Sequence, residues 1–349
     1  MTAGAAPPRL EIVAGRADDM RAELVLIVTL PDARGAGPVV TGTLTGPWRG
    51  RESTLPTTVT LAPMAATLPP NAAAVRGVFT EPAYWSPALP NLYRLRLRVE
   101  TADREPAVID RLVGLRRLGV RGRSLWLEGR RWVPRGVAGT GDAFDPAALR
   151  RLAAAVELVE PAADTCGAAD GAGVAIVARL AVDADRVAAA ARVAAWAMHP
   201  SVVLLVLPRR LPPGEAAAIA AAVRPVRGTT PLAVEVDGTL PPPAAGGIVG
   251  AGDGAGGPDC LVVDLPEEGL PHEAWRAWPG TLPLVARRAA AVDGSPDAAG
   301  LRRECDRLQA ALAAWGVAEG AVVPPWDWAG YLAVRQPREG AVSRRSPPA

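Results

Sequence analysis

The sequence contains no lysine, so all 38 of its Lys and Arg positions are arginine. These arginines are interspersed with 36 acidic residues, which leaves a formal net charge of only +2. Surfaces that bind nucleic acid or anionic membranes carry a clustered positive excess. The charge balance therefore predicts neither a nucleic-acid partner nor a membrane partner.

Histidine and cysteine are also scarce, with two and three residues respectively. Cys166, Cys260 and Cys305 are widely spaced and odd in number, which gives neither a disulfide framework nor a zinc-binding pattern. We expect them to be buried thiols. Two histidines do not assemble a histidine-based catalytic triad or a metal site. No metal and no cofactor is therefore expected.

Long apolar runs are missing, although 49% of the residues are hydrophobic. No run approaches the roughly 18 residues that a transmembrane helix needs. Residues 1–15 contain no basic region followed by an apolar one, the pattern of a secretory signal peptide. These features predict a large hydrophobic core without a membrane span, and the lack of a visible signal peptide favours the cytoplasm.

The first third of the chain has the pattern of an antiparallel β-sandwich. Short runs rich in β-branched residues recur between glycines and prolines from residue 9 to about residue 120. Over residues 92–100, LYRLRLRVE, apolar residues alternate with charged ones, which is the period of a half-buried strand. We predict an immunoglobulin-like sandwich over residues 9–120, preceded by a disordered N-terminus over residues 1–8.

The rest of the chain alternates apolar strands with alanine-rich helical segments. Eight strand candidates with intervening helices predict a compact (β/α)8 TIM barrel over residues 121–335, followed by a disordered tail over residues 336–349. The glycine-rich stretch 244–257 lacks phosphate-loop spacing, so it predicts a flexible loop. The segment Ser295-Pro296-Asp297 predicts the start of the last helix, with Ser295 as N-cap and Pro296 as the first helical residue.

Four motifs follow one another along the chain: YWSPALPNLY at 84–93; Gly114-Leu115-Arg116 with Leu127-Glu128-Gly129 and Arg135-Gly136-Val137; HPSVVLLVLPRR at 199–210; and Trp326-Asp327-Trp328. Together and in this order they resemble motifs of glycoside hydrolase family 2. The third resembles HPSxxxWxxGNE of the family's fourth barrel strand, and the last resembles the W-D-W of its eighth. The resemblance implies the sandwich and the barrel, without the jelly-roll domain that usually precedes them in the family.

The same resemblance implies that the ancestral catalytic carboxylates are lost. The family places its acid/base at the end of the fourth strand and its nucleophile at the end of the seventh, and this sequence has Arg210 and Arg288 at those positions. A retaining glycosidase needs two carboxylates about 5 Å apart. Arginine stays protonated near neutral pH, so it serves as neither acid/base nor nucleophile. The sequence therefore predicts a pseudoenzyme.

Other carboxylates follow apolar strands and are candidates for relocated catalytic acids, Glu235 and Asp264 above all. With a relocated pair, the chain would be an active O-glycosyl hydrolase of carbohydrate metabolism. The simpler interpretation is that these carboxylates pair with the abundant arginines.

Trp326, Asp327 and Trp328 are candidate sugar-binding residues, because an indole at a barrel mouth can stack on a sugar ring. Filling of the hydrophobic core is the alternative. Three hypotheses follow. The first is a non-hydrolytic protein with a carbohydrate ligand or a protein partner, and the second is the active hydrolase. The third is a structural or interaction protein, which a barrel mouth plugged by arginine and glutamate would favour.

Overall fold

The computed structural model describes residues 6–31, 37–50, 52–102, 104–139, 144–183, 185–242, 257–266, 269–290 and 297–335. The predicted disordered tail (336–349), most of the predicted disordered N-terminus (1–8) and nearly all of the glycine-rich stretch (244–257) lie outside these residues. Among the described residues, no helix combines the length and the apolar character needed to cross a membrane.

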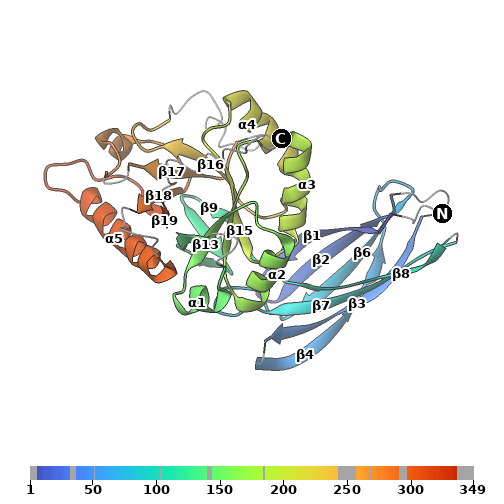
Figure 1. Cartoon of the computed structure of the whole chain (residues 1–349). Helices are drawn as coiled ribbons and strands as arrows, with labels where there is room; N and C mark the ends of the chain where they lie inside the picture. The colour runs from blue at the N-terminus through green and yellow to red at the C-terminus, as the bar shows by residue number, and fades with distance from the viewer. Residues whose placement is uncertain are drawn as a thin grey trace, which may run out of the picture.

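The N-terminal region is a sandwich of two antiparallel four-stranded sheets (Figure 1). Alternating side chains of both sheets fill the space between them, with Leu26, Leu44, Leu95 and Leu97 almost fully buried. The immunoglobulin-like sandwich is confirmed. One sheet has the order β1 (Arg9–Ala17), β2 (Arg21–Thr29), β6 (Ala72–Thr80), β5 (Ala62–Met64), and the other β4 (Glu52–Thr60), β3 (Val39–Arg49), β7 (Leu92–Thr101), β8 (Arg104–Val113).

A small three-stranded sheet follows, formed by β9 (Leu118–Arg121), β10 (Ser124–Leu127) and β11 (Arg130–Arg131). Glu128 and Gly129 both have positive φ, 54° and 73°, in the turn that joins β10 to β11. That is the backbone of a type I′ hairpin turn. The predicted domain boundary at residue 120 falls inside β9, so the transition from sandwich to barrel passes through this sheet.

Eight parallel strands then close into a barrel with helices around it, as predicted (Figure 1). A 3-10 helix over Glu273–Ala277 stands between the sixth and seventh barrel strands. The strands are β12 (Arg135–Ala138), β13 (Ala155–Val159), β14 (Ile176–Arg179), β15 (Val202–Leu207), β16 (Leu232–Asp237), β17 (Cys260–Leu265), β18 (Leu284–Ala290) and β19 (Trp328–Arg335). The helices are α1 (Pro146–Arg151), α2 (Ala163–Ala172), α3 (Arg186–Ala197), α4 (Pro213–Val223) and α5 (Ala298–Gly316).

Aspartate caps begin three of the helices. Asp145 and Asp185 each accept hydrogen bonds from two backbone N–H groups of α1 and α3, and Asp297 accepts one from Gly300 at 2.7 Å. Asp297 is the N-cap of α5, whereas Ser295 and Pro296, predicted as N-cap and first helical residue, lie outside the described residues. The three cysteines are buried and free, as predicted.

Two of the sequence motifs meet where the sandwich joins the amino-terminal end of the barrel. A Cβ atom added at Gly114 would lie 2.5 Å from Pro200 Cγ, so only glycine allows this approach. Arg116 donates hydrogen bonds to the carbonyl oxygens of Ala197 (3.3 Å) and His199 (3.1 Å), and to the hydroxyl of Thr230 (2.6 Å). We call this region the junction.

Asp170 at the end of α2 completes the junction. Its carboxylate lies 2.6 Å from His199 Nδ1 and accepts the backbone N–H of Ser201 at 2.9 Å. Its carbonyl oxygen accepts the indole N–H of Trp85 from the sandwich, also at 2.9 Å. The segment His199-Pro200-Ser201 is therefore structural, at the end of the barrel opposite to that where TIM barrels carry their active sites.

Candidate functional site

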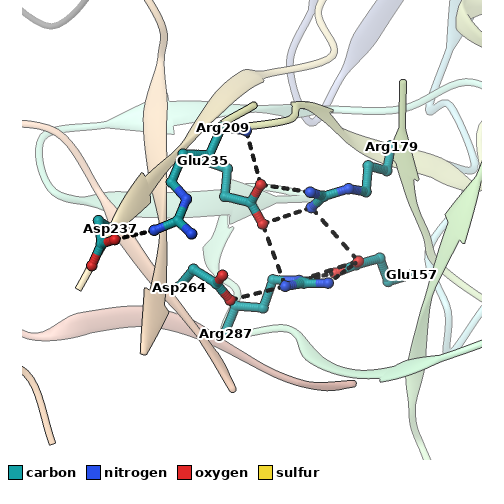
Figure 2. Close-up of polar contacts among 7 residues, drawn as sticks. All are labelled: Glu157, Arg179, Arg209, Glu235, Asp237, Asp264 and Arg287. Atoms are coloured by element: carbon teal, nitrogen blue, oxygen red, sulfur yellow. Dashed lines mark hydrogen bonds and ion pairs between the residues drawn. The ribbon is translucent and has the colours of Figure 1, made fainter. Parts of the chain in front are cut away.

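A cluster of charged side chains fills the carboxyl-terminal mouth of the barrel (Figure 2). Five of the eight barrel strands contribute one inward-facing residue each, and side chains alternate between the two faces of a strand. The residue two positions earlier on each strand, for example Val177 or Val285, belongs to the apolar interior. The five residues, which we call the mouth cluster, are Glu157 on β13, Arg179 on β14, Glu235 on β16, Asp264 on β17 and Arg287 on β18.

The two arginines of the mouth cluster bridge all three carboxylates. Arg179 donates two hydrogen bonds to Glu235, at 2.8 and 2.5 Å. Arg287 donates to Glu157 from Nε and Nη2 at 3.1–3.2 Å, and its Nη1 lies 2.9 Å from Asp264 Oδ1 and 3.3 Å from Glu235 Oε1. Figure 2 shows that these contacts form one connected network rather than separate pairs.

The network is largely removed from solvent. Glu157 and Glu235 are 6% and 5% exposed, and the side chains of Arg179 and Arg287 are 15% and 17% exposed. Buried charges are tolerated only when they are paired and hydrogen-bonded. Counted as ionised groups, three acids and two arginines leave one negative charge in excess.

Burial and charge act in opposite directions on the acids. Burial raises the pKa of the Glu235 carboxyl, but Arg179, the backbone N–H of Arg209 and Arg287 outweigh it, so that the pKa lies below its usual value. For Asp264, burial and the neighbouring Glu235 outweigh the attraction of Arg287, so that its pKa is raised. Burial lowers the pKa of Arg287, but the three carboxylates prevail and raise it. Arg287 is therefore a permanent cation.

Glu235 and Asp264, the predicted relocated acids, do converge at the mouth. Both contact the same Nη1 atom of Arg287, at 3.3 and 2.9 Å. A retaining pair needs a similar closeness, about 5 Å, with the anomeric carbon between the two carboxylates. Here the Arg287 guanidinium contacts both carboxylates, so their charges are paired with it and are not presented to a substrate.

Arg210 and Arg288, predicted at the positions of the acid/base and the nucleophile, lie outside the mouth cluster. Arg210 follows β15 and is exposed. Leu284 and Ala286 on β18 pack toward α5, and Arg288 continues their side of the strand, whereas Val285 and Arg287 face the interior. The arginine that fills the mouth is therefore Arg287, one residue before the predicted one. The residue before Arg210 contacts the cluster instead: the backbone N–H of Arg209 donates to Glu235 at 2.9 Å, and the side chain of Arg209 pairs with Asp237.

Trp326, Asp327 and Trp328 lie at the other end of the barrel, which corrects their predicted place at the mouth. They come directly before or at the start of β19, so they are at its amino-terminal end. Trp326 is 8% exposed and packs against Trp315 of α5 and against Trp328, with ring centroids 6.3 and 5.2 Å apart. Asp327 contacts Arg131 at 3.6 Å. The two indoles fill the core.

Arg179 is a member of the mouth cluster to which the sequence analysis assigned no role. It stands two residues after Val177 at the end of a predicted strand and shares its face, and the structure shows that this face points into the barrel. Within the described part of the chain, no group of three or more histidine, cysteine, aspartate or glutamate side chains is arranged to hold a metal ion.

No protein-family model and no curated protein matches this sequence. Several solved structures are similar to it in fold. Bacteroides uniformis β-glucuronidase 2 (12% identity, TM-score 0.59) is covered over 45% of its length by 93% of this chain. Bifidobacterium dentium β-glucuronidase (14% identity, TM-score 0.59) is covered over 59% of its length by 93% of this chain. The GH2 β-galacturonidase from Eisenbergiella tayi (14% identity, TM-score 0.60) is covered over 64% of its length, also by 93% of this chain.

The chain thus spans between 45% and 64% of the length of these three proteins. At such low identity the likeness shows the fold alone, a sandwich and barrel like those of glycoside hydrolase family 2.

Proposed function

We propose that this chain is a non-hydrolytic protein with a glycoside hydrolase family 2-like fold, and that it acts through contacts with a partner protein. The observation that carries the proposal is Arg287, which bridges Glu157, Glu235 and Asp264 in the mouth where a glycosidase would hold its substrate. A plugged mouth favours a structural or interaction role over sugar turnover.

The chemistry of glycoside hydrolysis supports the proposal. The reaction requires one protonated carboxyl to protonate the leaving oxygen and one ionised carboxylate to stabilise or attack the anomeric carbon. In the mouth cluster, Glu235 accepts three hydrogen bonds from Arg179 and the backbone of Arg209. A fixed guanidinium beside the subsite also disfavours the positive charge that develops on the sugar ring.

A carbohydrate ligand is supported less well than a protein partner. The tryptophans expected to stack on a sugar, Trp326 and Trp328, are buried in the core at the amino-terminal end of the barrel. The carboxylates and guanidiniums of the mouth cluster, which would otherwise bind sugar hydroxyls, are engaged with one another.

The experiment is aglycone release from aryl β-galactosides, β-glucuronides and β-mannosides by the purified protein. We expect no release above buffer from a preparation whose cooperative thermal unfolding shows that it is folded. Release that co-purifies with the protein and disappears in Glu235→Gln would overturn the proposal, with Asp237→Asn on the same strand as the matched control.

An active hydrolase with Glu235 and Asp264 as its catalytic pair is the second candidate. It is favoured by one observation, namely that both carboxylates reach the same Nη1 atom of Arg287. In that case Asp264, whose pKa is raised, would be the general acid. Loss of activity in both Glu235→Gln and Asp264→Asn would identify this candidate.

A further inference from the structure

The small sheet β9–β10–β11 lies at the amino-terminal end of the barrel and is rich in arginine. Five arginines lie between residues 117 and 131, against a single acidic residue, Glu128. One face of the sheet packs inward through Leu118, Leu125 and Leu127, which are at most 8% exposed. The register places Trp126 opposite Gly119 and Arg131, and Ser124 opposite Arg121, so these residues share the outward face.

Most of these arginines have no carboxylate partner. Within the described residues, Arg121 and Arg130 form no ion pair, and Arg123 donates to the carbonyl oxygen of Pro325. The pair between Arg131 and Asp327 spans 3.6 Å between side chains that are 46% and 83% exposed, so water screens it. Arg117 pairs with Asp19. Arg130 stands opposite Leu127 in the register and so belongs to the other face of the sheet. The outward face therefore presents the guanidinium groups of Arg121 and Arg131 to an anion.

Trp126 orients one of them. The Arg121 guanidinium lies over the Trp126 ring, 4.8 Å from its centroid. Arg121 thereby covers a face of the indole that could otherwise stack on a sugar ring or a nucleobase. Recognition at this face thus relies on the guanidinium groups, which pair with carboxylates in a bidentate manner.

A second row of arginines provides the contrast. Arg94, Arg96 and Arg98 point outward from β7 of the sandwich, but Asp110 accepts from the first two and Glu100 pairs with the third. That row is neutralised by its neighbours, whereas the row on β9–β11 is not.

We propose that the outward face of β9–β11 binds an acidic segment of a partner protein, with Arg121 and Arg131 as the recognition residues. Arginine clusters recognise acidic peptide motifs through charge-assisted hydrogen bonds, and arginine and tryptophan are enriched among the residues that dominate protein interfaces. This surface would bind the partner protein proposed above, independently of any hydrolysis at the mouth cluster, because the two lie at opposite ends of the barrel.

The test is fluorescence anisotropy of a labelled oligo-glutamate peptide with the full-length protein. We expect salt-sensitive binding that weakens by about tenfold or more in Arg121→Gln/Arg131→Gln, because two guanidinium–carboxylate pairs are lost. Arg94→Gln/Arg96→Gln removes the same charge from β7 and is the matched control, expected to bind within about twofold of the unchanged protein. Both pairs of sites are exposed, so folding is preserved and is checked by thermal unfolding.

Three outcomes would overturn the inference. The first is no binding of the peptide. The second is equal weakening in both double variants, which would mean attraction by overall charge alone. The third is binding of polygalacturonate or of a single-stranded oligonucleotide in preference to the peptide, which would assign the surface to a glycan or a nucleic acid. Lysine supplies the charge of arginine without its planar fork. If Arg121→Lys/Arg131→Lys binds the peptide with less than half the affinity of the unchanged protein, bidentate recognition is supported.

Discussion

The two ends of the barrel differ in how their residues compare with the family they resemble. At the amino-terminal end, Gly114, Arg116 and His199-Pro200-Ser201 have the residue types of the resembled motifs, and they contact one another across the junction. At the carboxyl-terminal end, arginines and carboxylates that pair with one another fill the mouth. One end of the barrel therefore holds the contacts that join the two domains, and the other holds a network of paired charges.

The difference has a physical basis. The junction depends on shape, because Gly114 leaves no space for a side chain and Arg116 reaches several carbonyl oxygens at fixed positions. The mouth cluster depends on charge balance, which different combinations of arginine and carboxylate can satisfy. We expect substitutions at the junction to disturb packing at every pH, and substitutions at the mouth to have effects that depend on pH.

The largest effect is expected for Trp326→Ala at the amino-terminal end. Removal of this buried indole leaves a cavity beside Trp315 and Trp328, which should lower the free energy of unfolding by about 3–5 kcal/mol. Urea unfolding followed by circular dichroism measures it. A stable Trp326→Ala protein would show that the indole is a surface group, as the sugar-stacking hypothesis required.

Arg116→Met should have the second-largest effect on the free energy of unfolding, because it leaves the carbonyl oxygens of Ala197 and His199 without their donor inside the junction. We expect the free energy of unfolding to fall by about 3 kcal/mol at both pH 5 and pH 7, because the hydrogen-bond partners of Arg116 are carbonyl oxygens and a hydroxyl, which do not titrate. Burial lowers the pKa of the Arg116 guanidinium to about 10, so it stays charged over this range. A strongly pH-dependent loss would mean that the junction is electrostatic after all.

Arg287→Met should destabilise by about 2–3 kcal/mol at pH 7, because three carboxylates lose their shared cation. Burial already raises the pKa of Asp264, and loss of Arg287 raises it further, whereas Glu235 keeps Arg179 and the backbone N–H of Arg209. The cost at Asp264 is fully present above its raised pKa and disappears as the pH falls through that value. Thermal unfolding of both proteins from pH 7 to pH 4.5 should show the gap closing.

In the unchanged protein, the effect of pH on stability at Glu235 has the opposite sign to that at Asp264. The pKa of Glu235 is lowered in the folded state, so its contribution to stability is present above the unfolded value and is lost as the pH falls through the folded one. Asp264, whose pKa is raised, offsets part of this loss, because its protonation relieves the folded state. A gap between the two proteins that widened on acidification would contradict the description of the mouth as an ion-pair network.

The smallest effect is expected for Glu128→Asn in the turn between β10 and β11. Glu128 has a φ of 54°, a region that asparagine tolerates better than glutamate, especially before a glycine in a type I′ turn. We expect stabilisation of about 0.5–1 kcal/mol, measured as a rise in the midpoint of urea unfolding. Glu81→Asn, at another positive-φ glutamate (51°) in the sandwich, is a matched comparison outside the barrel end.

By itself, the sequence determined the architecture. The alternation in LYRLRLRVE predicted a sandwich strand, the change to βα alternation predicted the barrel, and both are present. It also predicted that carboxylates after the strands would meet arginines, as Glu235 and Asp264 do.

Only the tertiary structure decided which residues face the mouth. Strands such as β15 are buried on both faces, so their apolar pattern does not reveal which side points into the barrel. A shift of one residue exchanges the two faces, and this is why Arg287 and not Arg288 bridges the acids. Trp326 was misplaced for a related reason, because a motif gives the strand but not which of its ends the residue occupies. Strand parity and strand ends are fixed by closure of the barrel, which brings together residues as far apart in the chain as Glu157 and Arg287.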